Sequence, residues 1–83
     1  MYQRVKFRST QENYRKEFLG LKSNTLRKQD IEDERFQKLL DFELGNLNNL
    51  VIEIINTKTN ESFQKIISDV TSYEDWIIIS WRV

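Results

Sequence analysis

From residue 50 onward, apolar residues recur with a period of two, the spacing of a β-strand that buries one face. Residues 50–55 and 62–70 form two such segments, and the polar stretch 56–61 between them is typical of a hairpin turn. A second polar stretch at 71–75 precedes residues 76–82, which are apolar on nearly both faces. Because such a strand is buried on both sides, we expect residues 76–82 to lie inside the sheet.

A further strand is expected near the N-terminus. Residues 2–8 alternate strictly, with Arg4, Lys6 and Arg8 on one face and Val5 and Phe7 on the other. The alternation predicts a half-buried strand, and its outer face carries three cations where a solvated strand more often mixes charges of both signs.

A first helix is expected after this strand. Ser9 and Glu12 have the spacing of a capping box, and Gly20 is well placed to end the helix in a left-handed conformation. Helical spacing assigns the buried stripe to Tyr14, Phe18 and Leu21. The side chains expected to point outward are Arg15, Lys16 and Glu17.

A second helix is expected from Asp30, which has the character of an N-cap, to a stop at Gly45. Its buried stripe is expected to consist of Phe36, Leu39, Leu40 and Leu44. The acids at its start alternate as in a calcium loop, but Arg35 occupies the position that requires glycine. We therefore expect helix capping there and no metal site.

These elements predict one α+β domain over residues 1–83, built as a small antiparallel β-barrel or a strongly curved sheet with two helices. A short strand at residues 25–28 follows the first helix. In it, Thr25 and Arg27 share one face and Leu26 faces the other way, which suits a strand with a site on one side and a core on the other.

The sequence contains no Cys, His, Pro or Ala. Zinc sites of the Cys/His kind are therefore excluded, as are nucleophile systems that depend on Cys or His. Catalysis by this chain would rest on Lys, Ser, Thr, Tyr or carboxylates, and no cofactor is expected. The lack of Ala and Pro beside abundant Asn, Ile and Lys favours AT-rich coding, as in a low-GC bacterium or its phage.

The longest uninterrupted apolar run, residues 76–79, is far shorter than the roughly 20 residues that span a bilayer as a helix. The first residues have no apolar run that could serve as a signal peptide. We therefore expect a cytoplasmic protein without a membrane partner, present as a monomer or weak dimer.

Charge is unevenly distributed along the chain. Residues 1–28 carry eight basic residues against two acidic ones, and residues 29–83 carry five against eleven. The basic third can follow the phosphates of a nucleic acid, or the two halves can neutralise each other on folding. The candidate ligand-binding residues are Arg4, Lys6, Arg8, Lys22, Ser23, Asn24, Thr25, Arg27 and Lys28.

The segment 20–27 gives the chain a resemblance to a known family. Gly20 is followed by Lys22 and, after Thr25, by Arg27 at the start of a strand. This pattern resembles the ASCH branch of the PUA-like superfamily, small β-barrels with one or two helices that are generally associated with RNA. That family often carries Glu at the position of Thr25.

With Thr25 at this position, the run from Lys22 to Arg27 resembles that of small bacterial ASCH enzymes that remove the acetyl group from N4-acetylcytidine. The resemblance implies Thr25 as nucleophile, Lys22 as its base and Arg27 as a positioning residue. A lysine can activate a threonine hydroxyl when it is partly desolvated. Those enzymes take a carboxylate from a later helical insertion, where this chain has Glu74 and Asp75 in a short turn.

Three functions follow from these observations. The first is binding of RNA or a nucleotide in a basic groove around residues 22–28, with Trp76, Trp81 or Tyr73 available to stack a base. The second is docking on a host protein, as a phage-type inhibitor, through an acidic helix surface carrying Glu32, Asp33, Asp41 and Glu43. The third is the amidohydrolase activity that the resemblance implies.

Overall fold

The computed structural model describes residues 2–82 and contains two helices and five strands. The strands are β1 (Gln3–Ser9), β2 (Asn24–Lys28), β3 (Leu50–Asn56), β4 (Ser62–Tyr73) and β5 (Trp76–Trp81). The helices are α1 (Gln11–Phe18) and α2 (Glu34–Glu43). The predicted α+β class is confirmed, and none of the helices in residues 2–82 is long and apolar enough to cross a bilayer.

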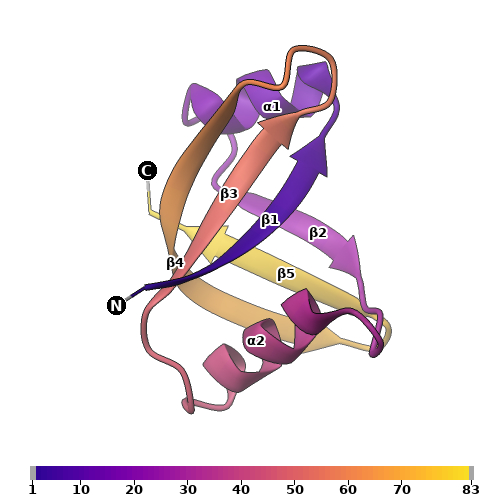
Figure 1. The fold of residues 1–83 in the computed structure, drawn as a ribbon, viewed down its shortest axis with the longest axis vertical. Coiled ribbons are helices and arrows are strands. Elements are labelled where there is room, and N and C mark those ends of the chain that lie inside the picture. The colour runs from indigo at the N-terminus through magenta and orange to yellow at the C-terminus, as the bar shows by residue number, and fades with distance from the viewer. Residues whose placement is uncertain (1, 83) are drawn as a thin grey trace.

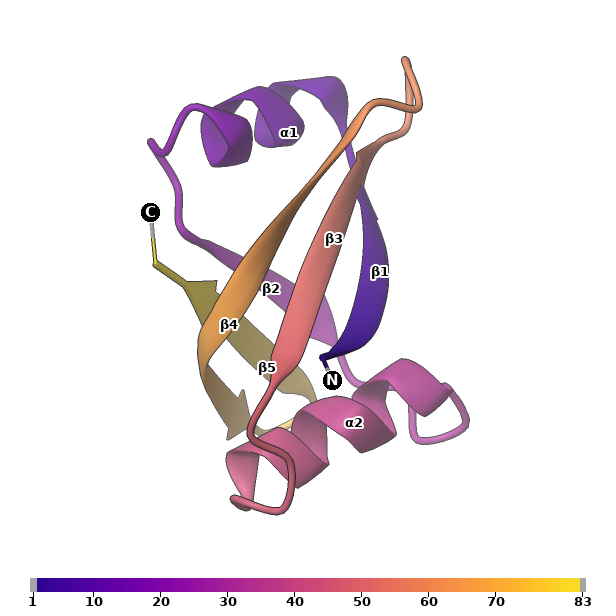
Figure 2. The same ribbon diagram turned by 60° about the vertical axis from the view of Figure 1, so that its left-hand side comes forward.

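The strands form one curved sheet in the order β1-β3-β4-β5-β2. The long strand β4 pairs with β3 through its first half and with β5 through its second, with a register shift between Ile67 and Asp69. The sheet thereby curls into a half-barrel, with α1 at one end and α2 at the other (Figures 1 and 2). The predicted strongly curved sheet with two helices is confirmed.

The sheet is mixed, whereas the strand pattern predicted antiparallel pairing throughout. β1 and β3 run parallel, with Val5 opposite Ile52 and Phe7 opposite Ile54. A parallel pair needs a long crossover, and the chain supplies one through α1, β2 and α2. Because alternation marks which residues face inward but not which way a neighbouring strand runs, the sequence pattern does not reveal this pairing.

The core confirms most of the strand assignments. Val5, Ile52 and Ile54 are buried in the β1–β3 half of the sheet, and Ile77 and Ile79 in β5 have no exposed surface. β5 lies between β4 and β2, so its predicted interior position is confirmed. Its outer face is less covered than expected, since Trp76 and Ile78 remain partly exposed.

The start and the inner face of α1 differ from the prediction. The N-cap is Thr10, whose Oγ1 accepts a hydrogen bond from the Asn13 amide, because Ser9 is still the last residue of β1 and is buried there. Tyr14 is buried as expected, but Phe18 and Leu21 are exposed. Glu17, which was expected to point outward, has no exposed surface and takes the inner position.

α2 begins later than predicted. Asp33 is its N-cap and accepts a hydrogen bond from the Arg35 amide, whereas Asp30 caps the turn before it by accepting from the Glu32 amide. Within the expected stripe, Phe36 and Leu39 are buried, Leu40 is partly buried and Leu44 is exposed. Gly20 and Gly45 both adopt positive φ angles just beyond their helices, as predicted.

The half-barrel leaves β1 with an open edge. The N–H and C=O groups of successive residues in a strand point alternately to its two sides. Those of Gln3 and Ser9 point toward β3, so those of Arg4, Lys6 and Arg8 point toward the open edge. Each of these three carbonyls accepts a hydrogen bond from a cationic side chain. Arg27 Nη1 donates to the Arg8 carbonyl (2.9 Å), Arg35 Nη1 to the Lys6 carbonyl (2.6 Å) and Lys38 Nζ to the Arg4 carbonyl (3.5 Å). An edge strand capped in this way offers few acceptors to another chain.

Arg27→Ala removes three hydrogen bonds, so it is expected to destabilise the fold by at least about 1.5–3 kcal/mol, the contribution of one hydrogen bond of a charged group. Arg27→Lys keeps the charge but loses the planar fork, so it should destabilise nearly as much. Arg8→Ala is the matched control, since only the backbone carbonyl of Arg8 is used. Urea unfolding measures all three, and equal midpoints for Arg27→Lys and the wild type would contradict this role.

Candidate binding groove between the edge strands

The open ends of the sheet, β1 and β2, face each other across a groove that Arg27 bridges. A pocket of about 220 Å³ lies toward α1 and is lined by Arg8, Ser9, Thr10, Asn13, Glu17, Lys22, Thr25, Leu26 and Arg27. A second pocket of about 420 Å³ lies toward α2 and is lined by Phe7, Arg8, Arg27, Lys28, Asp30, Asp33, Arg35 and Phe36. We call the two together the seam, and its parts the α1-side and α2-side pockets.

The structure brings five of the nine predicted binding residues to the seam. Arg8, Lys22, Thr25 and Arg27 line the α1-side pocket, and Lys28 lines the α2-side pocket. The others line neither pocket: Arg4 and Lys6 lie exposed on the outer face of β1, and Ser23 and Asn24 lie between Lys22 and Thr25 in the chain.

Strand β2 presents the predicted alternation, but the burial of its two faces is reversed. Thr25 is almost fully buried and Arg27 is partly buried, so their shared face points into the half-barrel. Leu26, expected toward a core, is 55% exposed. A five-residue edge strand with polar residues inside is possible because the Thr25 side chain accepts a hydrogen bond from Arg27, which in turn donates to β1.

Arg27 uses all three of its nitrogens within the protein. Nε donates to Thr25 Oγ1 at 3.0 Å, Nη1 donates to the Arg8 carbonyl and Nη2 donates to Ser9 Oγ at 3.2 Å. Its guanidinium also lies 5.0 Å from the centre of the Phe7 ring. Burial lowers the pKa of Arg27 and Glu17 opposes that fall, while a guanidinium stays charged at every physiological pH.

Glu17 is the residue of this site that sequence reasoning missed. It is fully buried, it lines the α1-side pocket, and its carboxylate oxygens make no hydrogen bond of standard geometry within the described residues, although the Ser9 hydroxyl lies close enough to affect its pKa. Burial raises the pKa of Glu17, and the nearby Ser9 hydroxyl and the charges of Lys22 and Arg27 oppose this rise. Glu17 follows the buried Tyr14 by three residues, a spacing that fits the same helix face, but Phe18 follows by four and fits that face equally well.

Lys22 and Thr25 line the same pocket, but the structure shows no hydrogen bond between their side chains within residues 2–82. The Thr25 oxygen instead accepts from Arg27. Its own hydroxyl proton is therefore free to be donated to a ligand or a base.

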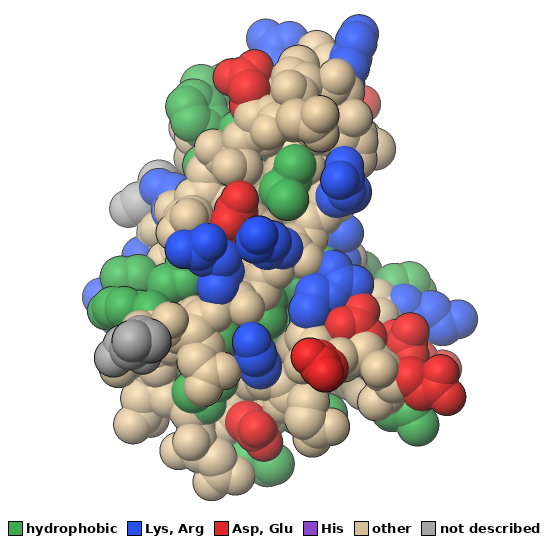
Figure 3. Space-filling model, viewed as in Figure 1, with side chains coloured by type: hydrophobic (Ala, Val, Ile, Leu, Met, Phe, Trp, Pro, Cys, Tyr) green, Lys and Arg blue, Asp and Glu red, His purple; other side chains and the backbone are tan. Residues whose placement is uncertain are grey.

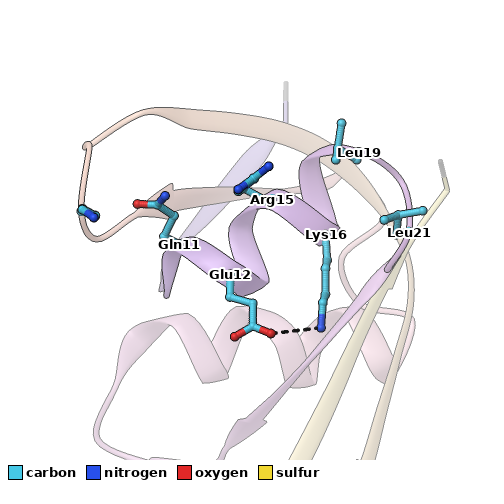
Figure 4. Close-up of a pocket in the computed structure, with 7 residues that line it drawn as sticks. Gln11, Glu12, Arg15, Lys16, Leu19 and Leu21 are labelled. Atoms are coloured by element: carbon cyan, nitrogen blue, oxygen red, sulfur yellow. Dashed lines mark ion pairs between the residues drawn. The ribbon is translucent and has the colours of Figure 1, made fainter.

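Two larger cavities on the surface offer weaker sites. One, of about 480 Å³, lies along the outer side of α1, where Lys16 and Glu12 form an exposed ion pair at 3.5 Å (Figure 4). The other, of about 660 Å³, lies along β4 beside Arg82. Neither is lined by a buried ionisable side chain, and residues 2–82 contain no cluster of three carboxylates that could hold a metal ion.

Glu17→Gln is expected to change how stability depends on pH. Since burial raises the pKa of Glu17 above 4.5, the native chain holds this proton more tightly than the unfolded chain does. The resulting stability is fully present below the unfolded pKa and is lost as the pH rises through the folded pKa. The wild type should therefore lose stability relative to Glu17→Gln as the pH rises above 4.5, in urea unfolding at a series of pH values.

Asp33 makes the opposite contribution to the pH dependence of stability, because hydrogen bonds from Arg35 lower its pKa. That contribution is the same in both variants and cancels in the comparison. A stability difference between wild type and Glu17→Gln that does not vary with pH would contradict the rise that burial causes in the pKa of Glu17.

Comparisons with known proteins leave the site to be interpreted from its own geometry. No family model matches this sequence, and neither the curated proteins nor the solved structures gave a significant match. The resemblance to ASCH domains therefore stays a prediction from residues 20–27.

Proposed function

We propose that the chain binds single-stranded RNA or a nucleotide in the seam. The observation that carries the proposal is the α1-side pocket, a small polar cavity that forms one half of a cationic groove. Five cationic side chains and three carboxylates line the seam. The cations are Arg8, Lys22, Arg27, Lys28 and Arg35, and the carboxylates are those of Glu17, Asp30 and Asp33. A groove with this excess of positive charge attracts phosphates.

The size of the pocket limits what can enter it. At about 220 Å³ it is smaller than the roughly 300–1,000 Å³ of sites for drug-sized ligands. A single planar base, without its sugar and phosphate, therefore suits it better than a whole nucleotide. Unstacked bases of single-stranded RNA are recognised by hydrogen bonds to their exposed edges, which is the type of contact that a polar pocket provides.

The surface around the seam can guide the phosphates of a strand. Lys and Arg side chains gather along β1 across the middle of the molecule, and acidic side chains gather around α2 (Figure 3). Arg4 is partly neutralised by Glu53, at 3.5 Å, but exposed pairs of this kind are weak. The β1 cations therefore still add to the field that leads to the seam.

Aromatic side chains near the α2-side pocket offer a stacking surface. Trp76 is 42% exposed and lies opposite Lys28 in the β2–β5 register, and Tyr73 lies opposite Trp76. Stacking of a base on such a ring contributes about 1–3 kcal/mol. Trp81 is only 3% exposed, so the suggestion that it stacks a base is wrong.

The double variant Lys22→Gln/Lys28→Gln is expected to weaken binding of a short single-stranded RNA and to reduce its salt dependence. Removal of one phosphate-binding cation should lower the slope of log K against log salt by about 0.7. Lys58→Gln, in the exposed β3–β4 turn outside the seam, is the matched control. Fluorescence anisotropy at several salt concentrations measures both, and equal slopes for all variants would overturn the proposal.

The host-protein alternative has less support from the acidic helix. Asp33 is bound by Arg35, and Glu43 accepts hydrogen bonds from the Ser72 amide and hydroxyl. Two of its four predicted carboxylates thus have partners inside the chain. If the chain docks on a host protein, it should copurify with that protein and should show no affinity for RNA or DNA.

Glu17 favours a second candidate, the amidohydrolase. It places a buried carboxylate in the pocket of Lys22 and Thr25, whereas Glu74 and Asp75 lie in the exposed turn between β4 and β5. Release of acetate from N4-acetylcytidine, abolished by Thr25→Ala or Lys22→Ala, would support this activity. Release that survives both changes would exclude Thr25 and Lys22 as its catalytic residues.

A further inference from the structure

The two free oxygens of Glu17 point to a particular partner. A buried polar group without a well-formed hydrogen bond loses its interaction with water and recovers only part of it from its surroundings. Here both Oε1 and Oε2 of one carboxylate are in this state, in the wall of a pocket. A ligand with two parallel N–H donors would satisfy both oxygens at once.

We propose that the α1-side pocket selects guanine, with Glu17 accepting hydrogen bonds from the N1–H and N2–H groups of the base. This inference rests on the proposed binding of RNA or a nucleotide in the seam. It assigns Glu17 as the residue that determines which base is bound.

The edges of the other bases fit an ionised carboxylate less well. Adenine and cytosine each place a ring nitrogen acceptor next to the amino group, so one carboxylate oxygen would face a lone pair. Uracil has one N–H between two carbonyl oxygens, which leaves one carboxylate oxygen facing another acceptor. Guanine alone among the four presents two adjacent donors on this edge.

The remaining acceptor of that edge, O6, also has donors in the pocket. The Thr25 oxygen accepts from Arg27, which leaves the Thr25 hydroxyl proton available for donation. The Lys22 ammonium is a second donor, since no hydrogen bond or ion pair holds it within the described chain. The pocket thus offers a carboxylate beside donors, the complement of the guanine edge.

Access to Glu17 requires a side chain to move, because Glu17 has no exposed surface. Lys22 is partly exposed and unrestrained, whereas Arg27 is held by three hydrogen bonds. Displacement of Lys22 away from the carboxylate and toward O6 of the incoming base would uncover the carboxylate. The cation would then contact the ligand in its new position.

The test is an NMR titration of the full chain with GMP, IMP, AMP, CMP and UMP. GMP should bind about tenfold more tightly than AMP or CMP, since bidentate recognition of a base is worth about 1–3 kcal/mol. IMP lacks the N2 amino group and should bind between GMP and the others. Glu17→Gln offers one donor and one acceptor, so it should lose the preference for GMP and bind AMP and CMP more tightly.

Glu12→Gln makes the same change on the exposed side of α1 and should keep the wild-type order. Equal affinities for all five nucleotides, unchanged in Glu17→Gln, would overturn guanine selection and leave binding in the seam intact. No shift with any nucleotide, together with no affinity for single-stranded RNA, would overturn both proposals.

Discussion

The guanidinium of Arg27 is the interaction on which the half-barrel depends. The curved sheet ends at β1 and β2 without closing, and no backbone ladder joins these strands. Arg27 joins them through its side chain, with one hydrogen bond to the Arg8 carbonyl and one to Ser9 Oγ. A planar fork with donors in fixed directions suits this role, whereas a lysine carries all its donors on a single nitrogen.

The same bridge creates the candidate site. It holds Thr25 on the inner face of β2, divides the groove into two pockets and places a positive charge beside Glu17. Closure by a backbone ladder would have left no opening at this position. The groove therefore exists because one side chain, and not a row of backbone hydrogen bonds, completes the curved sheet.

Glu17 carries a cost that the fold does not require. Its burial without a hydrogen-bond partner is unfavourable, and the nearby charges of Lys22 and Arg27 offset only part of that cost, since the net effect on its pKa is a rise. An apolar residue in the same place would pack without this penalty. Retention of a carboxylate here is consistent with a role in ligand binding, where burial strengthens its hydrogen bonds.

The sequence by itself determined the elements. Periodicity located the strands, the glycines at 20 and 45 marked the ends of both helices, and the apolar segment 76–79 identified a strand inside the sheet. These features depend on neighbours within a few residues, so they are present in the local pattern. The basic segment 22–28 likewise located one wall of the seam.

Tertiary structure alone decided the parallel pairing of β1 with β3, the bridge from β2 to β1 and the inward position of Glu17. In a helix of eight residues, positions 17 and 18 both lie close to the face of Tyr14, so periodicity does not choose between them. The choice was made by the cations and hydroxyl that surround the end of α1, which come from β1, β2 and the segment between α1 and β2. Those residues meet only once the sheet has curled.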